Sequence, residues 1–106
     1  MHDKPSIEEI QAKVAELSGI SMEAMLSRNR TEVVATARQI AIYLCCEIYP
    51  NANSFALGKQ FNRSHSLIRE RAKYALERME VDPKFKAALL RCREDLKNNG
   101  CVKSGQ

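Results

Sequence analysis

The sequence predicts an all-α fold, a bundle of about six helices. Apolar residues recur at helical spacing along most of the chain, and no stretch alternates apolar and polar residues as a strand would. Proline, glycine and asparagine separate these periodic stretches and mark helix ends. Of the 106 residues, 44% are hydrophobic and 28% charged, which is typical of a folded domain. We expect one helical domain over residues 1–98 and a flexible tail over residues 99–106.

Two helices are expected in the first quarter of the chain. Ser6 and Glu9 have the spacing of a capping box, in which each side chain accepts a hydrogen bond from the other residue's amide. Gly19 is suited to end this first helix in a left-handed turn. Ser21 can then cap a short helix that ends near Leu26.

The third helix is expected to begin at Glu32 or Thr36 and to end at Tyr49, because Pro50 follows. Its apolar residues form one stripe along the helix, which is typical of a helix that buries one side. The stripe consists of Val33, Val34, Ala37, Ile40, Ala41, Leu44, Cys45 and Ile48.

A short fourth helix is expected over residues 55–61, with Ser54 as its cap. Gly58 lies inside it, and a glycine there costs roughly 1 kcal/mol relative to alanine. We interpret Gly58 as a point of close packing between helices.

The fifth helix is expected to begin at Asn62 or Ser64 and to end near Met79 or Glu80. Helical spacing indicates a buried stripe that consists of Ile68, Ala72, Ala75, Leu76 and Met79.

Asp82 followed by Pro83 is typical of a cap and the first position of a sixth helix. The expected inward residues of this helix are Phe85, Ala88, Leu89, Cys92 and Leu96. Asn98-Asn99-Gly100 is expected to end it.

Positive charge is concentrated in the middle of the chain. Residues 27–78 include nine basic and four acidic residues, whereas residues 1–26 include two basic and five acidic ones. This distribution favours a polyanionic partner, although a solvated basic face has the same composition.

Several other classes of protein are disfavoured. No apolar run approaches the roughly 20 residues of a membrane span, and the N-terminus lacks the apolar stretch of a signal peptide, so we expect a cytoplasmic protein. The four cysteines lack metal-ligand spacing, which predicts free thiols and neither a metal nor a cofactor. No nucleophile motif or paired carboxylates appear, so we do not expect an enzyme.

The stretch from Val34 to Ile68 has the order of a helix-turn-helix. A long helix leads through a turn into a short helix, and a second helix begins in a basic, polar segment. In such a unit the second helix presents its first side chains to base edges in the major groove. The candidates here are Arg63, Ser64, His65 and Ser66.

From about Ser6 to Leu96 the chain resembles the C-terminal DNA-binding domain of the bacterial replication initiator DnaA, which has a Trp-repressor-like arrangement of helices. The most specific match is Ala37-Arg38-Gln39-Ile40-Ala41-Ile42-Tyr43-Leu44; the others are Leu57-Gly58, Phe61, Arg63, His65, Ser66 and Met25-Leu26-Ser27-Arg28-Asn29-Arg30. No GxxxxGK[ST] loop occurs, so the resemblance implies a stand-alone relative without the ATPase domain.

The signature differs from the family's usual pattern. The family has two glycines and then Arg-Asp-His-Thr-Thr-Val, whereas here Asn62 precedes Arg63-Ser64-His65-Ser66-Leu67-Ile68. Ser64 replaces an acceptor suited to the cytosine amine, and Leu67 can contact a thymine methyl but cannot form a hydrogen bond. We therefore expect the family's fold with a different preferred DNA sequence.

The resemblance implies double-stranded DNA as the partner and a role in replication initiation or its regulation. The implied major-groove contacts are Arg63, Ser64, His65 and Ser66, with Leu67 and Arg71 as further candidates. Arg28 and Arg30 would enter the minor groove, and Arg38 and Lys59 would contact phosphates. Two alternatives stay open: a protein-interaction module that has lost DNA readout, and a small dimeric transcriptional repressor.

Overall fold

The computed structural model describes the backbone of residues 4–105 and the side chains of residues 4–97. The described part contains six helices and no strand, which confirms the predicted all-α fold. The helices are α1 (Ile7–Ser18), α2 (Met22–Leu26), α3 (Glu32–Ile48), α4 (Ser54–Phe61), α5 (His65–Val81) and α6 (Pro83–Gly105). Within this part, no helix combines the length and the apolar character needed to cross a membrane.

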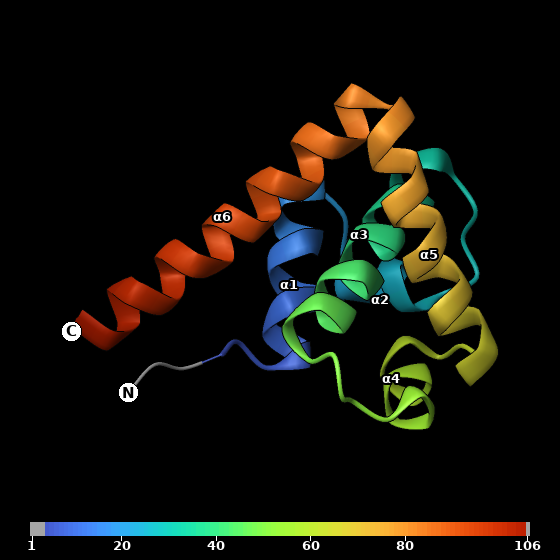
Figure 1. Cartoon of the computed structure of the whole chain (residues 1–106), viewed down its shortest axis with the longest axis horizontal. Coiled ribbons are helices and arrows are strands. Elements are labelled where there is room, and N and C mark those ends of the chain that lie inside the picture. The colour runs from blue at the N-terminus through green and yellow to red at the C-terminus, as the bar shows by residue number, and fades with distance from the viewer. Residues whose placement is uncertain (1–3, 106) are drawn as a thin grey trace.

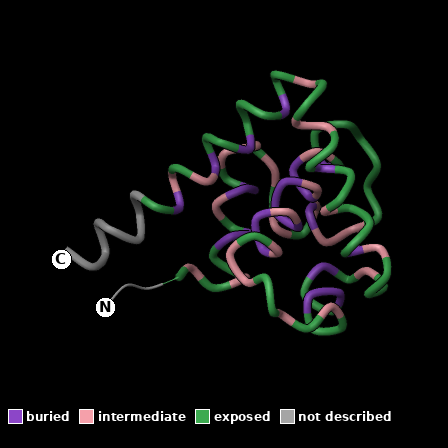
Figure 2. Tube along the Cα trace, in the orientation of Figure 1, coloured by how far each residue is buried: buried purple, intermediate pink, exposed green. Residues whose placement is uncertain are grey.

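Helix α3 occupies the centre of the molecule and contacts α1, α2, α5 and α6 (Figure 1). Its buried residues are Val34, Ala37, Arg38, Ile40, Ala41, Ile42, Leu44 and Cys45. Buried residues are concentrated in this central region, with α1 and α5 on either side of it (Figure 2). Full burial of one large aliphatic side chain contributes roughly 1.5–3 kcal/mol, so α3 stabilises the four helices that pack against it.

The predicted helix starts are largely correct because they depend on local hydrogen bonds. Ser6 Oγ accepts from the amide of Glu9 at 3.1 Å, and Glu9 Oε1 accepts from the amide of Ser6 at 2.8 Å, which completes the capping box. Gly19 follows α1 with φ 74°, in the left-handed region. Asp82 Oδ1 accepts from the amide of Phe85 at 3.2 Å and caps α6.

Several helix boundaries differ from the prediction. Helix α3 ends at Ile48, one residue before the expected end, and α5 begins at His65 and ends at Val81. Helix α4 begins at Ser54, and Asn53 is the cap, because its Oδ1 accepts from the amide of Phe55 at 2.8 Å. Helix α6 continues through Asn98-Asn99-Gly100 to Gly105, so the expected end there is wrong. The predicted domain limit at residue 98 stays a prediction.

Three residues predicted to face inward are exposed. Val33 lies in the first turn of α3 and is 57% exposed, whereas Ile42, outside the predicted stripe, is buried because α3 has neighbours on several sides. Leu76 is 51% exposed because only the side of α5 that carries Ala75 is buried. Ala88 is likewise exposed on α6.

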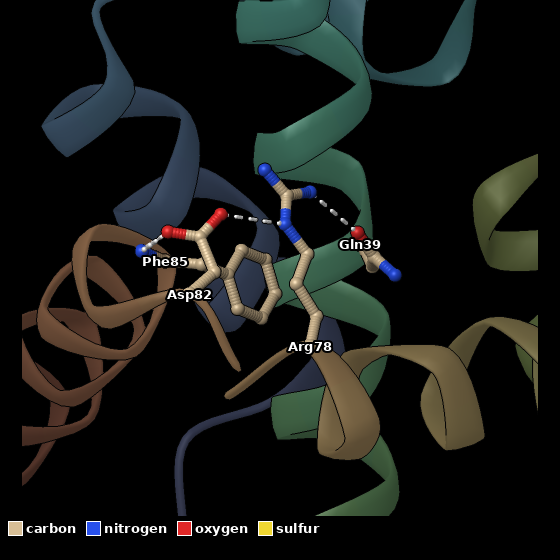
Figure 3. Close-up of polar contacts among 4 residues, drawn as sticks. All are labelled: Gln39, Arg78, Asp82 and Phe85. Atoms are coloured by element: carbon tan, nitrogen blue, oxygen red, sulfur yellow. Dashed lines mark hydrogen bonds and ion pairs between the residues drawn. The ribbon is translucent and has the colours of Figure 1, made fainter. Parts of the chain in front are cut away.

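Arg78 joins three helices near the end of α5 (Figure 3). Its Nε lies 3.2 Å from Asp82 Oδ2, and its Nη1 donates to Gln39 Oε1 on α3 at 3.1 Å. The guanidinium carbon lies 4.4 Å from the centroid of the Phe85 ring on α6. These contacts hold the sharp connection between α5 and α6 against α3.

Candidate nucleic-acid interface

The turn between α4 and α5 has the geometry that a helix-turn-helix requires. Asn62 adopts φ 56°, a left-handed conformation that asparagine tolerates better than most residues. The amide of Arg63 donates to the carbonyl of Gly58 at 2.8 Å. A Cβ at Gly58 would lie 2.6 Å from the carbonyl oxygen of Arg63, so the turn closes only over a glycine.

The first residues of α5 present polar side chains to solvent. Ser64 is the cap residue, and Ser64, His65 and Ser66 are all exposed. Ser64 makes no side-chain cap hydrogen bond, and its Oγ lies 3.4 Å from Ser66 Oγ. Ile68 is buried one turn further along and anchors the helix in the core. The hydroxyls and the imidazole are therefore available to an external partner.

An aromatic pair lies at the start of the two helices. The rings of Phe55 on α4 and His65 on α5 stack with centroids 4.1 Å apart and an interplanar angle of 30°. Phe55 is 62% exposed. Phe55 is not among the site residues predicted from the sequence. Phe55 lies outside the apolar stripe that Leu57 and Phe61 form. An aromatic residue outside such a stripe is the signal by which the sequence could have identified it.

The connector between α2 and α3, residues 27–31, forms a basic loop with its own hydrogen bonds. The amide of Asn29 donates to Ser27 Oγ at 3.0 Å, and the amide of Thr31 donates to Asn29 Oδ1 at 2.8 Å. Arg28 and Arg30 are exposed on this loop. A loop fixed in this way holds both arginines outside the core.

Arg38 is buried behind the basic loop instead of projecting into solvent. Its Nε donates to the carbonyl of Met25 at 2.8 Å, and its Nη2 donates to those of Ser27 at 2.9 Å and Asn29 at 3.2 Å. Burial lowers the pKa of Arg38, and the nearby Arg63 and Arg71 lower it further. We infer that this arginine, expected to contact a phosphate, positions the basic loop.

Arg63 joins the turn of the helix-turn-helix to the basic loop. Its Nη2 donates to the carbonyl of Ser27 at 2.6 Å, and its Nη1 donates to that of Asn62 at 2.9 Å. Partial burial lowers its pKa, with additional contributions from Arg28 and Arg71. The guanidinium N–H groups of Arg63, which we expected at a base edge, therefore donate to backbone carbonyls in this structure.

The structure brings most of the predicted site residues together around two hollows. One hollow, of about 490 Å³, is lined by Arg28, Arg30, Arg38, Arg63, Leu67 and Arg71, among others. The second, of about 530 Å³, is lined by residues that include Arg28, Lys59, Arg63, Ser64, His65 and Leu67. Since Arg28, Arg63 and Leu67 line both hollows, the hollows are neighbours on one face. Ser66 lines neither and lies exposed beside Ser64.

Histidine, cysteine and acidic side chains are the residues that could form a metal site in this chain. Within residues 4–97, no three histidine, cysteine or acidic side chains gather in a way that could hold a metal ion. Cys45, Cys46 and Cys92 are free thiols. Cys101 has its side chain outside the described residues. The basic, concave face is the strongest candidate site.

Comparison with known proteins agrees with this architecture. Residues 7–73 match the model of the bacterial DnaA protein helix-turn-helix, a range that covers α1 to α4 and the first half of α5. The chain is 35% identical over 86 residues to the chromosomal replication initiator protein DnaA of Gluconobacter oxydans, and 34% identical over 92 residues to that of Geobacter sp.. These alignments cover 79% and 86% of this chain but only 18% and 20% of the relatives. The chain belongs to the bacterial DnaA helix-turn-helix family.

Proposed function

We propose that the protein binds double-stranded DNA through its helix-turn-helix and acts, without catalysis, in replication initiation or its regulation in the cytoplasm. Helix α5 would enter the major groove with His65, Ser64 and Ser66, and the basic loop would enter the minor groove with Arg28 and Arg30. The observation that carries the proposal is the position of both elements on one face, around neighbouring hollows that share Arg28, Arg63 and Leu67.

The chemistry of this face suits duplex DNA. A narrow minor groove concentrates negative potential and attracts arginine side chains, and Arg28 and Arg30 are both exposed. Short hydroxyls and an imidazole can donate to or accept from base edges in the major groove. Lys59, which is exposed on α4, would contact phosphates and supply affinity without sequence preference.

Fluorescence anisotropy tests the proposal directly. A labelled duplex that contains an initiator-type box and a duplex of random sequence would each be titrated with the protein at low and moderate salt. We expect binding that weakens steeply with salt, with a log–log slope of about −0.9 for each phosphate contacted. Tighter binding to the box than to random DNA would mean that Ser64 and Leu67 still permit recognition of the family's box. Equal binding to both would mean that they do not.

The same titration separates the alternatives. A protein-interaction module would ignore both duplexes even at low salt, and this result would refute DNA binding. A repressor of the Trp type would elute as a dimer in gel filtration and would require two half-sites. Monomeric binding to a single site would support the initiator-like mode.

A further inference from the structure

One of the two hollows, which we call the arginine pocket, is lined by five arginines. Arg28 and Arg30 come from the basic loop, Arg38 comes from α3, and Arg63 and Arg71 come from the turn and from α5. The pocket has a volume of about 490 Å³, and none of the described residues that line it is acidic. Three separate segments of the chain therefore direct positive charge to one concave place.

The arginines of the pocket form no salt bridge with any described residue. Arg38 and Arg63 donate to backbone carbonyls, which satisfy hydrogen bonds but carry no net charge. Arg28, Arg30 and Arg71 form neither a hydrogen bond nor an ion pair with any described residue.

The arginines of the pocket also act on one another. Burial lowers the pKa of both Arg38 and Arg63, and Arg71 lowers both further because its positive charge repels theirs. An anion in the pocket would relieve this repulsion. A protein interior tolerates a partly buried cation best when a charged partner lies close to it.

We propose that the arginine pocket binds one phosphate group. The proposal rests on the proposed binding of duplex DNA, in which the phosphate belongs to the backbone strand that separates the major groove held by α5 from the minor groove held by the basic loop. The pocket lies between these two elements, so that strand would cross it. Planar guanidinium groups match two phosphate oxygens at once, which favours arginine over lysine in such a site.

Arg71 is the residue that would hold the phosphate directly. It is exposed, and its donors are free of hydrogen bonds to described residues. Arg38 and Arg63 use their donors on the carbonyl of Ser27 and so act as positioning residues that also contribute charge. Arg71→Gln removes the guanidinium group and its charge, and Arg71→Lys keeps the positive charge without the paired guanidinium donors. Arg91→Gln is the matched control, because Arg91 is exposed on α6 and does not line the pocket.

The first arm of the test neutralises DNA phosphates one at a time with methylphosphonates in a bound duplex. Anisotropy would be measured for the parent, Arg71→Gln, Arg71→Lys and Arg91→Gln proteins. We expect one particular methylphosphonate to weaken the parent and Arg91→Gln about tenfold, as loss of a charged hydrogen bond would, and to leave Arg71→Gln unchanged. If every methylphosphonate weakens binding by Arg71→Gln as much as it weakens binding by the parent, the assignment to the DNA backbone is overturned. Circular dichroism melting would show that the variants fold.

The second arm asks whether the pocket takes a free phosphate. Pyrophosphate would be titrated into the protein without DNA, and the arginine Nε–Hε signals would be followed by NMR. Saturable shifts that disappear in Arg71→Gln but persist in Arg91→Gln would indicate a site open to free anions as well. No dependence on Arg71 in either arm would overturn the proposal while DNA binding by the parent stands.

The two proposals fail in different ways. If the parent binds no duplex, the proposed function fails, and the pyrophosphate titration alone decides the phosphate site. If the parent binds duplex but neither arm depends on Arg71, the protein is a DNA-binding module whose arginine pocket has another role.

Discussion

Arg38 and Arg63 donate hydrogen bonds to the same backbone carbonyl, that of Ser27, over 2.9 Å and 2.6 Å. Arg38 extends from the central helix α3, whereas Arg63 lies in the turn that precedes α5. The basic loop is thereby tied both to the core and to the start of α5. The two elements proposed to enter neighbouring grooves are thus fixed relative to each other before DNA is present.

Replacement of Arg38 by methionine tests this connection. Methionine fills much of the volume but leaves the carbonyls of Met25 and Asn29 without the Arg38 donor and that of Ser27 with Arg63 alone. We expect the free energy of unfolding to fall by about 1–3 kcal/mol, the cost of leaving a buried polar group unsatisfied. Urea unfolding measures this loss, and faster amide hydrogen exchange in residues 27–31 would locate it. Unchanged exchange in the loop would contradict the positioning role.

Arg63 and Lys59 should differ in their effect on sequence preference. Arg63→Ala removes the contact between the turn and the loop, so we expect weaker binding together with a relaxed preference between the box and random DNA. Lys59→Ala removes only an exposed charge and should weaken both duplexes alike. Anisotropy titrations of both variants on both duplexes measure the difference. Equal loss of preference in the two variants would argue against the role given to Arg63.

The sequence predicted the helices well because their ends depend on neighbours along the chain. The capping box at Ser6 and the cap at Asp82 each involve residues within three positions. The inward face was less predictable at Val33 and Leu76, because which side of a helix is covered depends on the packing of distant segments. Periodicity alone does not contain that information.

The hydrogen bonds of individual arginines were harder to predict than their location. Arg38 and Arg63 are predicted to contact DNA, and in the structure both also donate to the carbonyl of Ser27, which is separated from Arg63 by 36 positions. Hydrogen bonds between distant segments leave no periodic signal in the sequence. The stack of Phe55 on His65 was missed for the same reason.

Phe55 should control how His65 meets the bases. The stacked ring restricts the imidazole, and aromatic pairs of this kind contribute about 0.5–1.5 kcal/mol beyond the area they bury. In Phe55→Leu, which keeps an apolar side chain without a flat ring, we expect reduced discrimination at the base pairs near His65 and an unchanged salt slope. Selection from a randomised duplex library, with His65→Ala for comparison, measures this. Identical preferences in the parent and Phe55→Leu would exclude the role.

Gly58→Ala should disturb the turn of the helix-turn-helix. The added methyl group would meet the carbonyl oxygen of Arg63 at 2.6 Å, and this backbone atom can move only if the turn opens. We expect a loss of about 1–3 kcal/mol in unfolding free energy, as overpacking usually costs. Gln60→Ala, an exposed change in the same helix, is the control and should leave stability nearly unchanged. A stable Gly58→Ala variant would show that α4 and α5 can separate at little cost.

The buried thiols should be inert in the folded protein. Burial raises the pKa of Cys45 to about 12 and that of Cys92 to about 11, so both remain neutral thiols near pH 8, where the reactive thiolate is scarce. Because these pKa values are raised on folding, the stability they contribute is present below pH 9 and falls as the pH rises toward 11 and 12. Mass spectrometry after brief maleimide treatment at pH 8 should find Cys45 and Cys92 unlabelled in native protein and labelled in urea. Rapid native labelling of Cys45 would mean that the centre of α3 opens far more often than its burial implies.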